Sequence, residues 1–263
     1  NETGRYFNHN VHSTRVLDRI FARNFTMQTL DGVLCHNGEF EQQEYRPNYA
    51  KTFDEYDAEV EACYTEGAPA IKRLIPSTLE GCVVRICDMI AYLGKDRQDA
   101  VLAGIIEPDY QFKTELIGTE NAKIINNLTV DIIEHSYGND YIMLSDKAFK
   151  DLSTAKKENY EVIYNNDVMN QQYDEIIKPI FEELYYKLLD NVKRNDTDSI
   201  IFKHHINPIG AALKQYHGID YSAEEKNQIV VDYIASMTDD YFIDLHKHMF
   251  PDSKYKVEYE PYF

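Results

Sequence analysis

Tryptophan is absent from this chain of 263 residues, and cations are scarce relative to acids. Lysine and arginine number 27 against 45 aspartates and glutamates, which gives a formal charge of −18 at pH 7. A chain this acidic is not expected to adhere broadly to nucleic acid or to anionic membranes. Nucleic acid is therefore not expected as its main partner.

Long apolar runs are also absent. Hydrophobic residues make up 43% of the chain, yet no uninterrupted run is long enough to span a bilayer, and no signal-like apolar segment is present. The sequence therefore predicts a globular, cytoplasmic protein with no membrane partner. The cysteines match no zinc-finger spacing, and we expect reduced core residues at all four positions: Cys35, Cys63, Cys82 and Cys87.

Several catalytic motifs are missing as well. The chain has no Walker A sequence, no glycine-rich dinucleotide fingerprint, no GxSxG and no HExxH. Phosphate handling by a P-loop and acyl transfer by a serine elbow are therefore unsupported.

Helical periodicity dominates what is present, with no repeat and no alternation of strands with helices. Capping boxes are predicted at Ser77–Glu80 and at Ser222–Glu225, and short strands near Tyr141–Leu144 or in residues 256–263. The pattern predicts a single all-α domain made of residues 1–197 and, as part of the same unit, a C-terminal helical subdomain at residues 198–263. Helices are expected at residues 13–24, 26–38, 52–67, 77–100, 121–136, 145–164, 171–195 and 222–250.

The segment from Ser77 to Ala100 places one carboxylate, Asp88, inside an otherwise apolar helical pattern. We expect this helix to be buried, because apolar residues occupy most of its circumference. They are Val83, Val84, Ile86, Cys87, Ile90, Ala91 and Leu93.

Asp88, Tyr92 and Asp96 are each four residues apart, so they follow one side of that helix, with Lys95 close beside them. A buried carboxylate needs a cation, a metal or several donors. The stripe therefore predicts a functional site, and an ordinary salt bridge from Asp88 to Arg85 or Lys95 is the alternative that spacing leaves open.

Three histidines are candidates. His9 and His12 are three residues apart and could share a helical face, or they could be surface residues near a helix start. His36 is explained by a position in a last helical turn, where the macrodipole favours it. Alternatively, His36 lines a pocket together with Glu39.

Four segments, in order, carry a family resemblance: FNHNVHSTRVL (7–17), VLCHNGE (33–39), CVVRICDMIAYLGKDRQDA (82–100) and VVDYIASMTDDYF (230–242). They resemble the deoxynucleotide triphosphohydrolases, the dGTPase branch of the HD superfamily. The resemblance implies an HD-domain-like helical fold with an additional C-terminal helical region. It also implies a homo-oligomer, tetramer or hexamer, and a possible allosteric nucleotide beside a dNTP substrate.

The resemblance assigns roles to individual residues. Asp88 matches a ligand of the family's divalent metal ion, which would be Mg²⁺, Mn²⁺ or a similar transition metal. His9 matches the acid catalyst near the α-phosphate, and Tyr92 and Asp96 match positions that approach the sugar. Lys95 stands where the family usually has histidine and is a candidate phosphate contact.

The family's first histidine and its His-Asp pair belong upstream of residues 7–17, and we expect them in residues encoded before Asn1. The resemblance implies metal-dependent hydrolysis of a dNTP, dGTP included, to deoxynucleoside and triphosphate. Two alternatives stay open: a non-catalytic nucleotide-binding or oligomerisation module, and another HD-type phosphohydrolase that acts on nucleoside monophosphates.

Overall fold

The computed structural model describes residues 4–21, 23–37 and 41–257, except for the side chains of residues 168 and 169. These residues form helices and one two-stranded sheet, which confirms the predicted all-α class. They divide into two compact units, one made of Asn1–Asp18 and Asn24–Asn166, the other of Arg19–Arg23 and Asp167–Phe263. The predicted division between residues 197 and 198 lies inside the second unit, and it stays a prediction about sequence domains.

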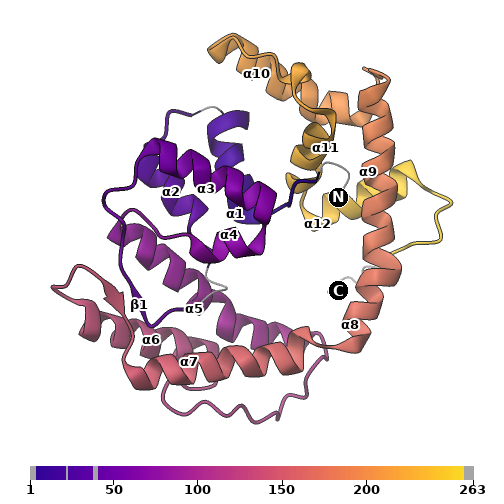
Figure 1. Ribbon diagram of the computed structural model, residues 1–263. Helices are drawn as coiled ribbons and strands as arrows, with labels where there is room; N and C mark the ends of the chain where they lie inside the picture. The colour runs from indigo at the N-terminus through magenta and orange to yellow at the C-terminus, as the bar shows by residue number, and fades with distance from the viewer. Residues whose placement is uncertain (1–3, 22, 38–40, 258–263) are drawn as a thin grey trace. The chain divides into compact units, whose positions relative to one another are not determined.

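The first unit is traced from indigo to rose in Figure 1. A π-helical turn at Val16–Ile20 follows its first helix, and another at Tyr160–Tyr164 follows its last. Its elements are α1 (His9–Arg15), α2 (Met27–Leu34), β1 (Glu44–Tyr45), α3 (Phe53–Glu66), α4 (Ala68–Arg73), α5 (Leu79–Leu102), α6 (Asn121–Ser136), β2 (Ile142–Met143) and α7 (Asp146–Asn159).

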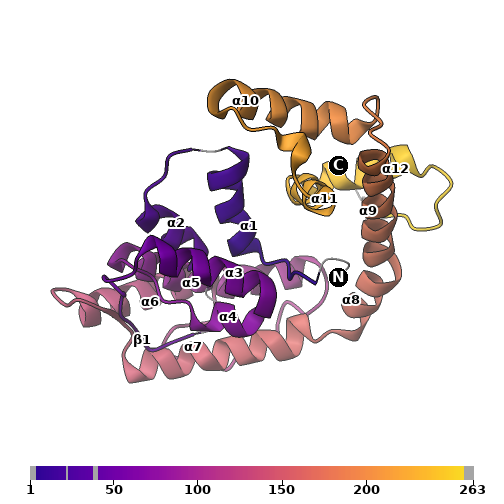
Figure 2. The ribbon, with the colours of Figure 1, turned by 45° about the horizontal axis from the view of Figure 1, so that its top comes forward.

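The second unit contains one long helical stretch, in which α8 (Asp167–Gln172) passes through a π-helical turn into α9 (Lys178–Lys193) (Figures 1 and 2). This confirms the continuous helix predicted at residues 171–195. The remaining elements are a π-helical turn (Phe202–Ile206), α10 (Asn207–His217), a 3-10 turn (Tyr221–Ala223), α11 (Lys226–Ala235) and α12 (Asp239–Met249).

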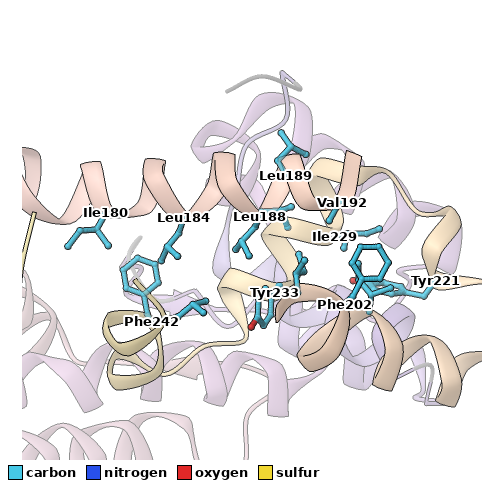
Figure 3. Close-up of a cluster of buried hydrophobic side chains, with 14 of the residues drawn as sticks. Ile180, Leu184, Leu188, Leu189, Val192, Phe202, Tyr221, Ile229, Tyr233 and Phe242 are labelled. Carbon is cyan, nitrogen blue, oxygen red and sulfur yellow. The ribbon is translucent and has the colours of Figure 1, made fainter. Parts of the chain in front are cut away.

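The core of the second unit lies between α9 and the last two helices. Leu184 and Leu188 of α9 point toward Tyr233 of α11 and Phe242 of α12 (Figure 3). Both leucines are fully buried. Burial of such side chains is the main favourable contribution to packing α9 against its neighbours, about 1.5–3 kcal/mol each.

Helix starts were predicted in the right regions but not always at the right residue. Thr78, not Ser77, caps α5 by accepting a hydrogen bond from the backbone N–H of Gly81 at 3.0 Å. Ser222 lies in the 3-10 turn, and the Glu225 side chain caps α11 instead. The single helix predicted at residues 222–250 is also wrong, because α11 ends at Ala235 and Thr238 caps a separate α12.

The two-stranded sheet joins distant parts of the first unit. Glu44 is opposite Met143 and Tyr45 is opposite Ile142 in an antiparallel pair. This confirms the strand expected near Tyr141–Leu144. No strand forms at residues 256 and 257, and the rest of that second candidate, residues 258–263, lies outside the described residues.

Helix α5 is buried on one side only. Ile86 and Leu93 are fully buried, as predicted, in a core shared with α6 and α7, and Met89 is fully buried beside them. Four residues expected to be buried are instead exposed, because no described element covers them: Val83 (41% exposed), Val84 (49% exposed), Cys87 and Ala91.

A buried ionic cluster ties α2 to the loops before α3 and α5. The ammonium group of Lys51 lies 2.7 Å from Oδ1 of Asp31 and 2.8 Å from Oε2 of Glu59. The other oxygen of Asp31 accepts the backbone N–H of Ser77 at 2.6 Å. Only 1% of the side-chain surface of Lys51 and of Asp31 is exposed, so each of these two charges depends on the other for compensation.

No helix in the described part of the chain is long and apolar enough to cross a membrane.

Candidate functional site

The polar stripe predicted on α5 is present. Asp88, Tyr92 and Asp96 follow one another at helical spacing and are each half-buried, while Lys95 beside them is exposed. Half-buried polar groups keep access to solvent and to a ligand. The stripe can therefore contact a bound molecule without opening the core.

The two cations considered as partners of Asp88 are engaged elsewhere. Lys95 forms an ion pair with Asp99, one turn further along α5. Arg85 is 1% exposed and donates a hydrogen bond from one terminal nitrogen to the carbonyl oxygen of Leu74. Neither cation needs Asp88 to explain its position.

Asp96 accepts a hydrogen bond from the hydroxyl group of Tyr164, in the π-helical turn after α7. Burial raises the pKa of Tyr164, and the Asp96 carboxylate raises it further. The tyrosine therefore stays protonated and acts as a donor. Sequence reasoning did not select Tyr164, and its only signal was a position at the end of the helical segment predicted at residues 145–164.

Two histidines lie together at the start of α1 and just after α2. The rings of His9 and His36 are edge to face, with centroids 5.2 Å apart. Nδ1 of His36 lies 2.6 Å from the carbonyl oxygen of Val33, which can only accept, so this nitrogen carries a proton. Nε2 is then the nitrogen through which His36 can exchange a proton or bind a ligand.

His12, by contrast, is 8% exposed, and its ring packs 5.3 Å from that of Phe7. His9 is exposed. The two histidines of α1 therefore have different surroundings, and the structure brings His9 to His36.

A groove of 620 Å³ lies between α1, α2 and α5. Its walls are mostly apolar, and His36 lines it. Gly32 of α2 and Gly81 of α5 both line it, and a Cβ built on Gly32 would be 4.0 Å from the Cα of Gly81. The lining residues are Ser13, Gln28, Thr29, Gly32, Val33, His36, Thr78, Glu80, Gly81 and Val84.

The α5 wall of this groove leads toward the polar stripe. Val84 lines the groove, and Asp88 follows it by one helical turn. Ser13 lines it from α1 and follows His9 by one turn. The alternative in which His36 lines a pocket is thus supported, whereas Glu39, its suggested companion, lies outside the described residues.

Metal ligands are not gathered in the described part of the chain. No three histidine, cysteine, aspartate or glutamate side chains among the described residues are arranged to hold a metal ion. A divalent-metal site generally needs three or four protein ligands. The described residues therefore do not by themselves fit a complete metal centre around Asp88.

Comparisons with known proteins agree on one group. Residues 142–248 match the family model of the phosphohydrolase-associated domain. A deoxyguanosinetriphosphate triphosphohydrolase-like protein of Caldanaerobacter subterraneus is 28% identical over 177 residues, covering 66% of this chain and 47% of the relative.

Proteins of the same name are similar over more of the chain. The one from Clostridium perfringens strain SM101 is 27% identical over 89% of this chain and 58% of its own length. The one from Desulfatibacillum aliphaticivorans is 26% identical over 93% of this chain and 62% of its own length. The chain therefore spans about half to three fifths of these curated relatives, and no solved structure matches significantly.

Proposed function

Since the chain belongs to the deoxyguanosinetriphosphate triphosphohydrolase-like branch of the HD phosphohydrolases, we propose that it contributes to hydrolysis of deoxynucleoside triphosphates to deoxynucleoside and triphosphate. The observation that carries this proposal is the His9–His36 pair beside a groove whose α5 wall leads to Asp88. An exposed imidazole next to a mostly apolar groove suits proton transfer to a substrate whose base or sugar occupies the groove.

In this proposal the oxygen of a water molecule forms a bond to the α-phosphorus and releases a proton to solvent, while the bond from phosphorus to the 5′-oxygen breaks. His9 gives a proton to that 5′-oxygen, so that the deoxynucleoside leaves neutral. His36 packs against His9 and, because Nδ1 is held by Val33, restricts where the His9 ring can lie. Tyr92 and Asp96 contact the sugar, and Tyr164 orients Asp96 by its hydrogen bond. Hydroxyl and carboxylate groups are suited to a sugar hydroxyl because their oxygen atoms accept a hydrogen bond from it.

The substrate's negative charge requires local cations, because the chain carries −18 overall. Lys95 is the candidate on the stripe, and its present partner is the exposed Asp99. Exposed pairs of this kind are worth at most about 1 kcal/mol, so a phosphate group can replace the carboxylate at little cost. Lys156 is a second candidate, although it is paired with Glu41.

Asp88 offers one ligand to a divalent metal ion such as Mg²⁺ or Mn²⁺. Three such side chains do not come together in the described residues, so the other ligands would have to come from elsewhere. The roles given to His9, Tyr92, Asp96 and Lys95 do not depend on where those ligands originate.

The test is product identification with the protein in the presence of Mg²⁺ or Mn²⁺ and each dNTP. Replacing His9→Ala should slow release of triphosphate by about 100-fold or more, the usual contribution of general acid catalysis. His217→Ala, an exposed histidine of α10, is the matched control and should leave the rate unchanged. Equal rates for His9→Ala and the parent would contradict the assignment of His9.

The absence of a three-ligand group in the described residues favours a second candidate, a nucleotide-binding module without turnover. That module would be stabilised thermally by a dNTP and release no product. Orthophosphate from a nucleoside monophosphate, detected by ion-exchange chromatography, would instead indicate another HD-type phosphohydrolase.

A further inference from the structure

The residues on the outward face of α6 are uncharged, from the first turn of the helix to Tyr137, which follows the helix. Three apolar residues between the middle of this face and its C-terminal end are well exposed: Val130 is 45% exposed, Ile133 56% and Tyr137 90%. We call this surface the α6 stripe, and its members are Ala122, Asn126, Thr129, Val130, Ile133 and Tyr137.

The stripe is narrow and continuous. At 100° per residue its members fall within about a third of the helix circumference, and at 1.5 Å per residue they extend about 22 Å. The opposite side of α6 is already used, because Ile124 and Leu128 are fully buried in the core shared with α5. Exposed apolar surface that is contiguous over several turns marks an interaction surface more often than a scatter of single apolar residues does.

We propose that the α6 stripe is the contact surface between two copies of this chain, packed as an antiparallel helix pair about a two-fold axis. Two chains that each carry −18 repel one another over most of their surface. A charge-free face is where two such chains can approach. In a chain with 27% charged residues, six uncharged positions on one face are therefore informative.

The sizes of the side chains suit this arrangement. A two-fold axis near Thr129 and Val130 places Ala122 of one copy opposite Tyr137 of the other. It also places Asn126 opposite Ile133. The small residue at one end of the stripe thus receives the large aromatic residue from the other end, and an isologous interface requires such self-complementarity.

Charges at the edge of the stripe provide a second argument. Lys123 and Glu134 lie on the same edge of α6, at opposite ends. In an antiparallel pair about a two-fold axis, the same edge of each helix lies on the same side of the pair, and the two helices run in opposite directions. Lys123 of each copy therefore faces Glu134 of the other. Lys123 now pairs with Glu120 of its own chain at 3.1 Å, and both side chains are more than 60% exposed, so the lysine can exchange partners.

The first test is sedimentation velocity over a range of protein concentrations. A single helix pair lies at the small end of specific interfaces, so we expect a dimer with a Kd on the order of 10 µM. Ile133→Glu should raise this Kd at least about 10-fold, because it buries a charge in the interface, about one helical turn from the two-fold axis. Ile219→Glu, at an exposed isoleucine of the second unit, is the matched control and should not change it.

The second test uses the two-fold geometry. Lys123→Glu alone creates two repulsive Glu–Glu contacts per dimer, and Glu134→Lys alone creates two repulsive Lys–Lys contacts. Each variant should dimerise several-fold more weakly than the parent. Mixing the two variants restores both attractive contacts, so the mixture should form a heterodimer within about twofold of the parent's affinity.

Three results would overturn the proposal: a parent that is monomeric up to about 200 µM, an Ile219→Glu effect as large as that of Ile133→Glu, or no recovery on mixing. Circular dichroism and the melting temperature confirm that each variant is folded. None of these measurements depends on catalytic activity. The dimer proposal can therefore fail while the proposed function stands, and the proposed function can fail while the dimer proposal stands.

Discussion

At the scale of single residues, the buried ammonium group of Lys51 needs compensation by negative charge. It is compensated by Asp31 and Glu59, and Asp31 in turn accepts the backbone N–H of Ser77. The cluster therefore fixes the start of α5 relative to α2. The groove of the candidate site lies between these same helices, so its shape depends on Lys51.

Replacing Lys51→Met should lower the free energy of unfolding by about 3–5 kcal/mol, because Asp31 would be left as an uncompensated buried charge. Urea denaturation followed by circular dichroism measures this loss. Lys95→Met, which removes an exposed ion pair with Asp99, should cost less than about 1 kcal/mol. Similar losses for the two variants would show that the buried cluster contributes no more than a surface pair.

This cluster also marks a limit of sequence reasoning. The sequence predicted that a carboxylate inside an apolar helical pattern needs partners and selected Asp88, yet Asp88 is half-buried, whereas Asp31 of α2 is fully buried. Lys51 and Ser77, which donate hydrogen bonds to Asp31, are 20 and 46 residues away along the chain. Periodicity identifies the faces of one helix, but it does not indicate which distant loop supplies a cation.

At the scale of elements, α5 and α6 lie close together at Gly94. A Cβ on this glycine would lie 2.6 Å from the Cα of Asn121, at the first residue of α6. Backbone, unlike a flexible side chain, cannot move aside cheaply at that distance. The contact therefore requires glycine in the middle of a helix, where the residue is otherwise unfavourable by about 1 kcal/mol.

Gly94→Ala should destabilise the protein by about 1–3 kcal/mol, since the added methyl group separates α5 from α6. Gly32→Ala is the matched control, because a Cβ there meets nothing closer than 4.0 Å. That variant should be neutral or more stable by up to about 1 kcal/mol through better helix propensity. Thermal melting distinguishes the two, and a melting temperature for Gly94→Ala at or above that of the parent would contradict the close-approach argument.

Most elements could be predicted because their cues are local. Thr52 and Glu55 form the capping box of α3, and the apolar spacing of α9 indicates its buried side. The start of α5 was placed one residue too early because Ser77 and Thr78 are both suitable caps. The exposed side of α5 was not predictable, since Val83 and Val84 have the composition of core residues and only the arrangement of other elements leaves them uncovered.

At the scale of the whole molecule, the free energy of unfolding at alkaline pH should depend on the ionisation of buried cysteine thiols. Burial raises the pKa of Cys63 and that of Cys82 to about 11. In the unfolded chain a cysteine ionises near pH 8.5–9. A pKa that is higher in the folded state stabilises the fold below the unfolded pKa, and this contribution is lost as the pH rises through the folded pKa.

The free energy of unfolding should therefore fall between about pH 9 and pH 11, as the unfolded chain gains thiolates that the folded chain disfavours. Urea denaturation at several pH values measures the decline. In a variant with both Cys63→Ala and Cys82→Ala, the decline should be shallower, although the starting stability is lower. An unchanged slope in that variant would assign the alkaline sensitivity to other groups.

The division into two units shows a further limit at this scale. The predicted division between residues 197 and 198, which stays a prediction about sequence domains, falls shortly after α9, where Asn195 has a left-handed conformation at φ 54°. Compactness depends on contacts between distant segments, and composition does not report them. Within the candidate site, the stripe of Asp88, Tyr92 and Asp96 could be read from the sequence because its members share one helix. The His9–His36 contact could not, because it brings together two segments that are distant along the chain.

The small sheet has a consequence for the chain during its synthesis on the ribosome. Strand β1 leaves the ribosome long before β2, and the hydrogen bonds from Gln43 reach Leu144 and Asp146, 101 and 103 residues later. At about 5–20 residues per second, this interval lasts roughly 5–20 s. During that time the segment around Tyr45 has an unpaired edge, which is the part of a nascent chain most open to chaperones or to wrong pairing.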